Sequence, residues 1–137
     1  MIEYRSGGHA EIDAVLALWR IAATGPSVTD DAESVATLLA VAPDALVVAT
    51  DGSAIVGVVV AVFDGWRGAM YRLAVLPSYR RRGVASRLVQ EGERRLRAQG
   101  ARRLHMIVAA DQEPAQAFWA HAGYTPSDQA RFVKNLA

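Results

Sequence analysis

The sequence predicts a mixed α/β domain, with a mostly antiparallel sheet, one parallel βαβ crossover and helices on both faces. The main observation is the order of the expected elements, which is β, α, α, β, β, β, α, β, α, β. A turn signal at Asp51-Gly52 joins two valine-rich segments as antiparallel neighbours. A strand, helix, strand unit over residues 69–108 has the length of a parallel crossover. With 137 residues, of which 52% are hydrophobic, we expect a single domain over residues 1–137.

The first part of the chain is expected to form one strand and two helices. Residues 2–5 alternate apolar and polar side chains, as a short strand does. Residues 11–23 place apolar side chains at helical spacing, and a glycine–proline pair follows. A second helix is expected to start at Asp30, because a glutamate three residues later gives a capping-box-like pattern, and to end before Pro43.

The rest of the chain is expected to alternate strands with two helices. A long helix should begin at Val84 and end at Gly100, and a last helix should run from Pro114 to Ala122, with Gly123 at its C′ position. The predicted strands are residues 45–49, 55–63, 69–75, 104–108 and 132–136.

Charge is segregated along the chain. Residues 1–66 contain two arginines and nine carboxylates, a balance of −7, whereas residues 67–103 contain eleven arginines and two glutamates, a balance of +9. This asymmetry indicates that the middle of the chain meets an anion, and it suggests that the first half meets a cation. Some of the arginines are expected only to form a solvated helix face, namely Arg94, Arg95, Arg97, Arg102 and Arg103.

Several classes of protein are disfavoured by composition. The chain has no cysteine, which excludes disulfides, thiolate nucleophiles and cysteine-based zinc sites. His9, His105 and His121 lack ligand spacing, so no metal is expected, and His105 is interpreted as a hydrogen-bonded structural residue in an apolar strand. No signal peptide and no apolar run of membrane-spanning length is present, so we expect a cytoplasmic protein without a membrane partner.

The most informative segment connects the strand that ends at Val75 with the helix that begins at Val84. The first N–H groups of a helix have no intrahelical partner, and Ser, Thr, Asp or Asn normally caps them. This junction instead contains Arg80-Arg81-Arg82-Gly83. The bare amides, the helix dipole and the guanidinium charge together predict an external anion as the cap, which we interpret as a ligand phosphate.

Three segments resemble motifs of the GNAT (GCN5-related) N-acetyltransferases. Arg80-x-x-Gly83-x-Ala85 resembles the family's pyrophosphate loop, with alanine as an allowed variant of the last glycine. Leu73-Ala74-Val75-x-Pro77 resembles the fourth strand, and Ala115-x-x-Phe118-Trp119-x-x-x-Gly123-Tyr124 resembles the end motif. A bacterial subgroup of small single-domain members, typified by YpeA, is similar in the run Phe63-Asp64-Gly65-Trp66-Arg67-Gly68.

The resemblance implies the GNAT fold and acetyl-CoA as the cofactor. In the family, the fourth and fifth strands splay apart, so that Leu73 and Val75 would offer backbone groups to the pantetheine arm. Gln112 stands where the family usually has an asparagine that reaches the cofactor. The cofactor's diphosphate would be bound by the amides and charge of Arg80, Arg81, Arg82, Gly83, Val84, Ala85 and Ser86, and its other implied contacts are Ala74, Ala115, Phe118 and Trp119.

The catalytic groups are less defined. Trp119 stands where the family often has the tyrosine that protonates the leaving thiolate, and an indole N–H is too weakly acidic for that task, although it can donate a hydrogen bond to sulfur. Either another group or water protonates the thiolate, or the thiolate leaves unprotonated. Tyr124 is a nearby phenol at the position of a core aromatic residue.

The general base is also open. The family often uses a glutamate on or beside the fourth strand, and Met70-Tyr71-Arg72 supplies none. Tyr71 alternates with Leu73 along this strand and is expected on the same face, pointing into the cleft. Glu33, with Asp30 and Asp31, lies in the region that borders the acceptor in the family. These acids either attract or deprotonate an amine or only complement the helix dipole, and the second interpretation is favoured.

We therefore expect an acetyl-CoA-dependent N-acetyltransferase that moves an acetyl group to a primary amine by direct transfer in a ternary complex. The acceptor is expected to be a small molecule, a peptide or a protein. One alternative is a non-catalytic acetyl-CoA-binding module, motivated by Trp119 and the missing base. A nucleic-acid-binding basic domain is a remote alternative, because the basic helix lacks interleaved aromatic residues and known motifs. The oligomeric state is left open, with a homodimer as the common case.

Overall fold

The computed structural model describes residues 1–23, 25–107 and 113–136. These residues group into two compact units, Met1–Met106 and Ile107–Ala137. The first unit contains the sheet and three of the helices, and the second contains the last helix and the C-terminal segment.

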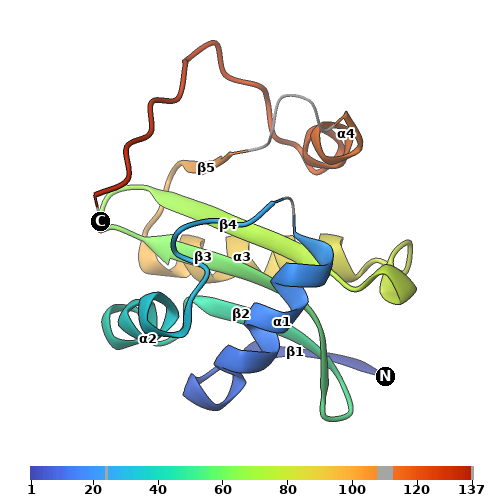
Figure 1. Cartoon of the computed structure of the whole chain (residues 1–137). Coiled ribbons are helices and arrows are strands. Elements are labelled where there is room, and N and C mark those ends of the chain that lie inside the picture. The colour runs from blue at the N-terminus through green and yellow to red at the C-terminus, as the bar shows by residue number, and fades with distance from the viewer. Residues whose placement is uncertain (24, 108–112, 137) are drawn as a thin grey trace. The chain divides into compact units, whose positions relative to one another are not determined.

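The first unit is built on a five-stranded sheet in the order β1-β2-β3-β4-β5 (Figure 1). The first four strands pair antiparallel, and β5 pairs parallel with β4. This arrangement confirms the predicted hairpin and the predicted crossover. The strands are β1 (Ile2–Ser6), β2 (Leu46–Asp51), β3 (Ala54–Phe63), β4 (Gly68–Val75) and β5 (Leu104–Met106).

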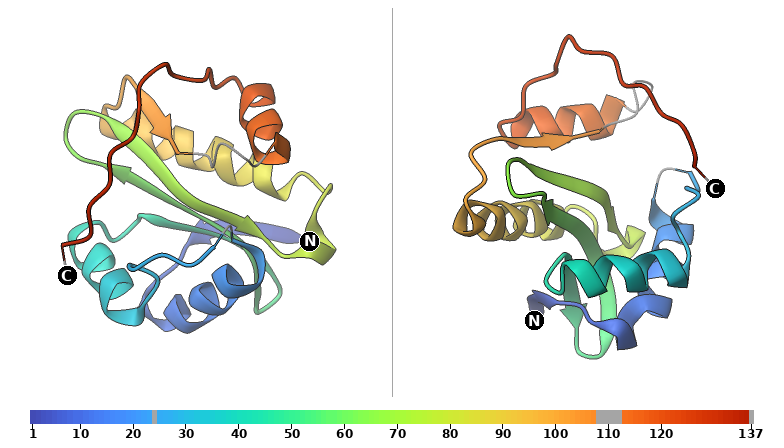
Figure 2. Two further views of the ribbon diagram at one scale, coloured as in Figure 1. Left: turned by 45° about the horizontal axis from the view of Figure 1, so that its top comes forward. Right: turned by 90° about the vertical axis from the view of Figure 1, so that its left-hand side faces the viewer.

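Helices cover both faces of this sheet, as predicted (Figure 2). On one face, α1 (Ile12–Ala22) and α2 (Ala32–Val41) pack on the strands, and their shared core includes the fully buried Val15, Leu46 and Val58. On the other face lies α3 (Val84–Gln99), the helix of the crossover. Two short 3₁₀ turns, His9–Glu11 and Pro77–Tyr79, precede α1 and α3.

Two glycines allow α3 to lie close to the sheet. A Cβ atom at Gly57 on β3 would lie 3.0 Å from Leu88, and one at Gly92 on α3 would lie 2.9 Å from the sulfur of Met70. Real Cβ atoms rarely approach other atoms so closely, so larger residues at these positions would push α3 away from β3 and β4. Gly57 and Gly92 are therefore close-packing points that hold α3 beside the sheet.

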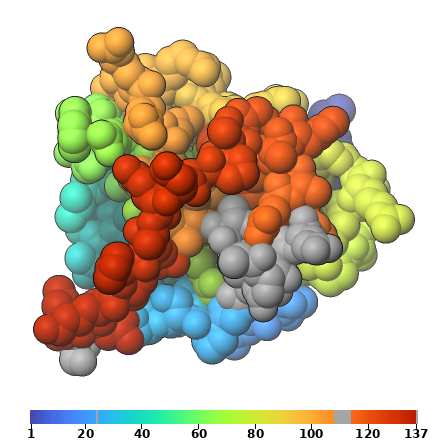
Figure 3. Space-filling view, turned by 90° about the horizontal axis from the view of Figure 1, so that it is seen from above, coloured from blue at the N-terminus to red at the C-terminus, as the bar shows by residue number. Residues whose placement is uncertain are grey.

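The second unit contains α4 (Glu113–His121) and the segment that follows it. Gly123 has a φ of +98°, which agrees with the predicted helix end. The predicted strand over residues 132–136 is wrong, because these residues form no strand and Phe132 and Leu136 are 94% and 93% exposed. Figure 3 shows this segment, in red, as an extended length of chain. A β-prone sequence becomes a strand only when a neighbouring strand supplies hydrogen-bond partners.

Two element boundaries differ from the predictions. The N-cap of α2 is Asp31, whose side chain accepts a hydrogen bond from the amide of Ser34 at 2.7 Å, and not Asp30. β5 ends at Met106 and is shorter than expected, while Val108 lies outside the described residues. Within residues 1–23, 25–107 and 113–136, no helix is long and apolar enough to cross a membrane.

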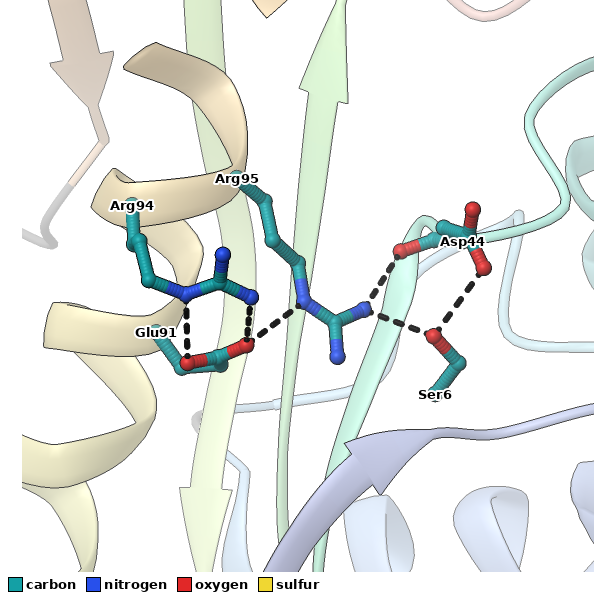
Figure 4. Close-up of polar contacts among 5 residues, drawn as sticks. All are labelled: Ser6, Asp44, Glu91, Arg94 and Arg95. Atoms are coloured by element: carbon teal, nitrogen blue, oxygen red, sulfur yellow. Dashed lines mark hydrogen bonds and ion pairs between the residues drawn. The ribbon is translucent and has the colours of Figure 1, made fainter. Parts of the chain in front are cut away.

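Arg95 does not belong to a solvated helix face, contrary to the prediction. Its side chain is only 15% exposed and donates to Glu91 Oε1 at 3.1 Å, to Ser6 Oγ at 2.7 Å and to the carbonyl of Asp44 at 3.2 Å (Figure 4). Its guanidinium therefore ties α3 to β1 and to the loop before β2. Arg94 also donates to Glu91, and these two arginines hold the pKa of that carboxyl at about 2, well below its ordinary value of 4.5, with the Arg94 hydrogen bond as the largest cause.

Replacing this carboxylate tests its role in stability. Because the pKa of Glu91 is lowered in the folded state, its contribution is fully present above about pH 4.5 and is lost as the pH falls towards about 2. We expect Glu91→Gln to lower the free energy of unfolding by about 1–2 kcal/mol at pH 7. The measurement is urea denaturation at pH 7 and at pH 3. The difference in the free energy of unfolding between variant and wild type should be smaller at pH 3 than at pH 7. Glu3→Gln, at an exposed carboxylate on β1, is the control, and an equal loss at both pH values would contradict the prediction.

Candidate functional site

The arginine loop, residues 77–83, leads directly into α3 without a side-chain cap. Gly83 occupies the N-cap position with a φ of +78°, and no side chain accepts from the first turn of the helix. The first helical bond is donated by the amide of Arg87 to the carbonyl of Gly83 at 3.0 Å. The amides of Val84, Ala85 and Ser86 therefore have no partner within the helix. The helix start predicted from the sequence is confirmed.

The backbone of the loop is shaped for an anion. Arg81 and Gly83 have positive φ values of 63° and 78°, in the left-handed region that disfavours residues with a Cβ atom. Main chain of this kind at a helix start presents successive amides to one concave site, where an anion is favoured by the helix dipole. The side chains of Arg80, Arg81 and Arg82 are exposed around it. The loop can therefore hold a phosphate group by amides and by charge.

Two contacts fix the loop to the sheet, and a third lies within the loop. The hydroxyl of Tyr79 donates to Asp51 Oδ2 at 2.6 Å, at the end of β2, and this hydrogen bond raises the pKa of the Tyr79 phenol. The guanidinium of Arg82 lies 4.9 Å from the centre of the Tyr79 ring. Arg80 Nε donates to the carbonyl of Val75 at 3.3 Å, at the end of β4. The loop is therefore fixed in place on its scaffold.

Beyond residue 70, β4 has no partner on its β5 side among the residues that the structure describes, and we call this stretch the open edge of β4. Residues 68–70 of β4 pair with residues 104–106 of β5, and the described pairing ends there. Tyr71, Ala74 and Val75 pair with β3 on the other side of the strand. The predicted separation of the fourth and fifth strands stays a prediction, because residues 108–112 lie outside the described residues. Backbone groups on such an edge are available to an extended ligand. The carbonyl of Val75 already accepts from Arg80, so part of the predicted pantetheine contact is used within the chain.

A β-bulge interrupts β4 at the same place. Val60 pairs with Tyr71 and Val58 pairs with Ala74, so the two strands shift register, and Arg72 has a φ of +56°. The extra residue breaks the simple alternation on which the predicted common face of Tyr71 and Leu73 was based. Tyr71 is 41% exposed, whereas Leu73 is half-buried.

The acidic residues near the start of α2 have separate roles. Asp31 caps the helix, as described above, and this hydrogen bond lowers the pKa of its carboxyl. Asp30 accepts from the amide of Ser27 at 3.0 Å and from the guanidinium of Arg72. Glu33 is exposed in the first helical turn. Asp31 at the N-cap fits the favoured interpretation, whereas Asp30 is engaged by Ser27 and Arg72 and not by the helix start.

The predicted residues of the end motif lie in the second unit. Ala115 and Phe118 are half-buried on α4, and Trp119 is only 6% exposed. The indole of Trp119 contacts Phe118 and Tyr124 edge to face, with ring centres 5.3 and 4.9 Å apart. Gln112 lies outside the described residues. The predicted residues of the strand and the loop, from Leu73 to Ser86, lie together in the first unit.

His105 differs from its prediction. It lies on β5, but its side chain is exposed and is not part of the core. Side chains alternate between the two faces of a strand, and on β5 the exposed His105 stands between the half-buried Leu104 and Met106. Among the residues that the structure describes, no group of three or more His, Asp or Glu is arranged to hold a metal ion.

Sequence analysis did not identify the supporting contacts of the site. From the sequence, Asp51 is recognised only as a turn residue. Trp19 is recognised as an apolar helix residue, and Tyr79 as an aromatic residue in a loop. Arg72 is noted in the sequence only because it stands near the position where the family often has the glutamate that acts as general base. Each acts on a partner far away in the sequence, and a single sequence contains no signal for such a pairing.

The uncapped helix start with exposed arginines, beside the open edge of β4, is an arrangement that suits a phosphate-containing ligand with an extended arm. Comparison with known proteins identifies the family. The sequence model of the Acetyltransferase (GNAT) family matches residues 12–124, and the chain therefore belongs to this family. The expected acetyl-CoA-dependent acetyltransferase is thereby confirmed, while the narrower likeness to YpeA stays a prediction.

Relatives and solved structures agree with this assignment. The chain is 30% identical over 135 residues to acetyltransferase ECA0875 of Pectobacterium atrosepticum, which covers 98% of this chain and 96% of the relative. It is similar in fold to Ard1 of Thermoplasma volcanium, with a TM-score of 0.83, 20% identity and coverage of 92% and 84%. It is also similar to the aminoglycoside N-acetyltransferase AAC(6')-Iy, crystallised with CoA, with a TM-score of 0.77, 19% identity and coverage of 100% and 96%.

The loop geometry predicts how a simple anion binds. We expect Arg82→Gln to weaken the binding of inorganic pyrophosphate about 3- to 10-fold, because it removes one charged donor from the loop. Arg97→Gln, in the exposed last turn of α3, makes the same charge change away from the loop and should have little effect. Isothermal titration calorimetry at low and high salt measures both. Equal losses in the two variants would show that only net charge matters.

Proposed function

We propose that this acetyltransferase transfers the acetyl group of acetyl-CoA to a primary amine by direct attack in a ternary complex, with no covalent enzyme intermediate. The supporting observation is the uncapped start of α3, with Gly83 at positive φ and three exposed arginines before it. Family membership supports the reaction. The neighbours AAC(6')-Iy and PaiA of Thermoplasma acidophilum, both crystallised with CoA, support the cofactor.

The residues of the first unit fit the cofactor. The amides of residues 81–86 would hold the diphosphate, and Arg80, Arg81 and Arg82 would balance its charge. The open edge of β4 at Leu73, Ala74 and Val75 would hydrogen-bond the pantetheine arm. Bound acetyl-CoA supplies the activated thioester. Gln112, Ala115, Phe118 and Trp119 complete the proposed cofactor contacts.

The acceptor side is proposed to involve Glu33 and Tyr71. Asp31 caps α2 and Asp30 accepts from Arg72, so Glu33 is the remaining carboxylate of that segment to attract or deprotonate an amine. Tyr71 is exposed next to the open edge. Neighbours of this fold include an aminoglycoside acetyltransferase and a ribosomal-protein-S18-alanine acetyltransferase of Escherichia coli. Both small amines and protein N-termini therefore belong in the acceptor screen.

The remaining expectations complete the proposal. Residues 1–137 act as one cytoplasmic catalytic domain, with a homodimer as the common arrangement for such proteins. Neither a nucleic acid nor a membrane is a partner. No metal is required, because the proposed transfer needs only a neutral amine and the thioester.

A matched pair of glycine variants tests the cofactor site. Gly83 and Gly52 both have positive φ, and a Cβ atom at either position would meet no atom within 4 Å. Glutamate therefore introduces similar backbone strain at both positions, but only Gly83→Glu places a negative charge at the proposed phosphate site. We expect Gly83→Glu to weaken acetyl-CoA binding at least ~10-fold, and Gly52→Glu to leave it near the wild-type value. Unchanged binding in Gly83→Glu would count against the proposed site.

A thiol-release assay of the wild type tests the reaction. Purified protein and acetyl-CoA are combined with small amines, peptides with free N-termini, lysine peptides and aminoglycosides. Release of CoA with at least one class supports the transferase. Tight acetyl-CoA binding without release from any class favours the non-catalytic module, for which the tryptophan at position 119 is the motivating observation.

Variants of Trp119 test how the thiolate leaves. We propose that the indole donates a hydrogen bond to the sulfur without transferring a proton. Trp119→Phe removes that donor and should lower kcat about 10-fold, as expected for a hydrogen bond to a charged group. Trp119→Tyr restores a donor and should recover most of the rate. The measurement is kcat between pH 6 and pH 10, and a full wild-type rate in Trp119→Phe would exclude this role.

A further inference from the structure

Arg72 occupies an unfavourable backbone position at the centre of the β4 bulge. Its φ of +56° lies in the left-handed region, where residues with a side chain are disfavoured. Such a conformation persists when the surroundings over-determine it, and it is frequent at functional sites. Glycine or asparagine would adopt it at lower cost. The contacts of Arg72 should therefore explain why an arginine is held in this conformation.

Both the main chain and the side chain of Arg72 are fixed by the first half of the chain. Trp19 Nε1 donates to the carbonyl of Arg72 at 3.0 Å, from the last turns of α1. Arg72 Nη1 donates to the carbonyl of Gly25 at 3.1 Å, and Nη2 donates to Asp30. The guanidinium also lies 5.4 Å from the centre of the Trp19 ring. The side chains of Arg72 and Asp30 are only 21% and 16% exposed, so this ion pair is largely shielded from solvent.

These contacts join two segments that border the open edge of β4. One is the bulge, which is preceded by the exposed Tyr71 and followed by residues 73–75, which no described strand pairs on the β5 side. The other is the loop over residues 25–30, which connects α1 to α2. A guanidinium has a rigid fork of donors, so it serves Gly25 and Asp30 at the same time, which a single ammonium group does less well. Asp30 is therefore a partner of Arg72 and not the general base considered from the sequence.

We propose that Arg72 is a positioning residue that fixes the open edge of β4 and the 25–30 loop in one arrangement, so that the acceptor amine meets the thioester in the correct geometry. This inference rests on the proposed acetyl transfer for its kinetic consequence. Its structural consequence is independent of that function. Arg72 acts through the backbone of residues 73–75 and through the loop, and it does not itself react.

Variants at position 72 separate the backbone from the side chain. Arg72→Gly accepts the positive φ and keeps the bulge but loses every guanidinium contact, and Arg72→Lys keeps the charge but loses the fork. We expect both to lower kcat/KM for the amine about 10- to 100-fold, because small misplacements of reacting groups have effects of this size. The dissociation constant of acetyl-CoA should change less than ~3-fold, because the arginine loop is intact. Arg94→Ala, which removes another arginine paired with a carboxylate, is the matched control.

Variants of the two partners test the same connection without changing Arg72. Asp30→Asn weakens the tether to the loop, and Trp19→Phe removes only the donor to the Arg72 carbonyl while keeping an aromatic ring. Each should lower kcat/KM for the amine. The double variant Arg72→Gly/Asp30→Asn should have the same kcat/KM as Arg72→Gly alone, because both changes break one connection. Thermal melting of every variant identifies those that lose the fold. If Arg72→Gly does not fold, the kinetics of Trp19→Phe still test the proposal.

Amide hydrogen exchange provides a readout that does not depend on activity. In Arg72→Gly, exchange should accelerate at least ~10-fold in residues 25–30 and 73–75, and it should be unchanged in Arg94→Ala. The inference is overturned if amide exchange in Arg72→Gly is unchanged in these residues. It is also overturned if exchange is faster but kcat/KM for the amine stays at the wild-type value. Failure of the proposed function is a different result, because the wild type itself would then bind no acetyl-CoA or release no thiol.

Discussion

The unpartnered amides at the start of α3 are the constraint on which the rest of the structure depends. A helix start requires acceptors, and this one has glycine and arginine where a capping side chain normally stands. Gly57 and Gly92 let α3 lie against β3 and β4, which fixes the helix start beside the end of β4. Tyr79 and Asp51 then fix the loop from the other side. Contacts on both sides therefore hold the loop and the helix start that we propose as the phosphate site.

The sheet supplies the second half of the site by leaving pairing incomplete. β4 pairs with β5 over residues 68–70 and then bulges, and no described strand pairs with its remaining residues on that side. Unpaired backbone groups on a strand edge lower the stability of a domain. The bulge at the start of this edge is held by contacts of Arg72 with α1 and with the loop before α2. The donor side and the acceptor side of the proposed reaction therefore share a single support.

Sequence reasoning succeeded where a local rule decides the structure. Gly100 and Gly123 end helices, the Asp51-Gly52 turn joins a hairpin, and α3 begins at Val84 without a side-chain cap, as predicted. It failed where a distant partner decides. Asp31 caps α2, while Asp30 is paired with the distant Arg72. Arg95 is drawn out of the solvent by Ser6 and Asp44, which accept from its guanidinium. Residues 132–136 have strand propensity but no neighbouring strand.

Arg81 shows how stability and ligand affinity oppose each other in this chain. With Arg72, it is one of two non-glycine residues at positive φ among those described, and an L-residue there costs about 1–2 kcal/mol relative to glycine. A search for thermostable variants would therefore favour glycine or asparagine at this position. The same exchange would remove a cation from the loop. Selection for heat resistance alone would be expected to erode the donor site first at Arg81.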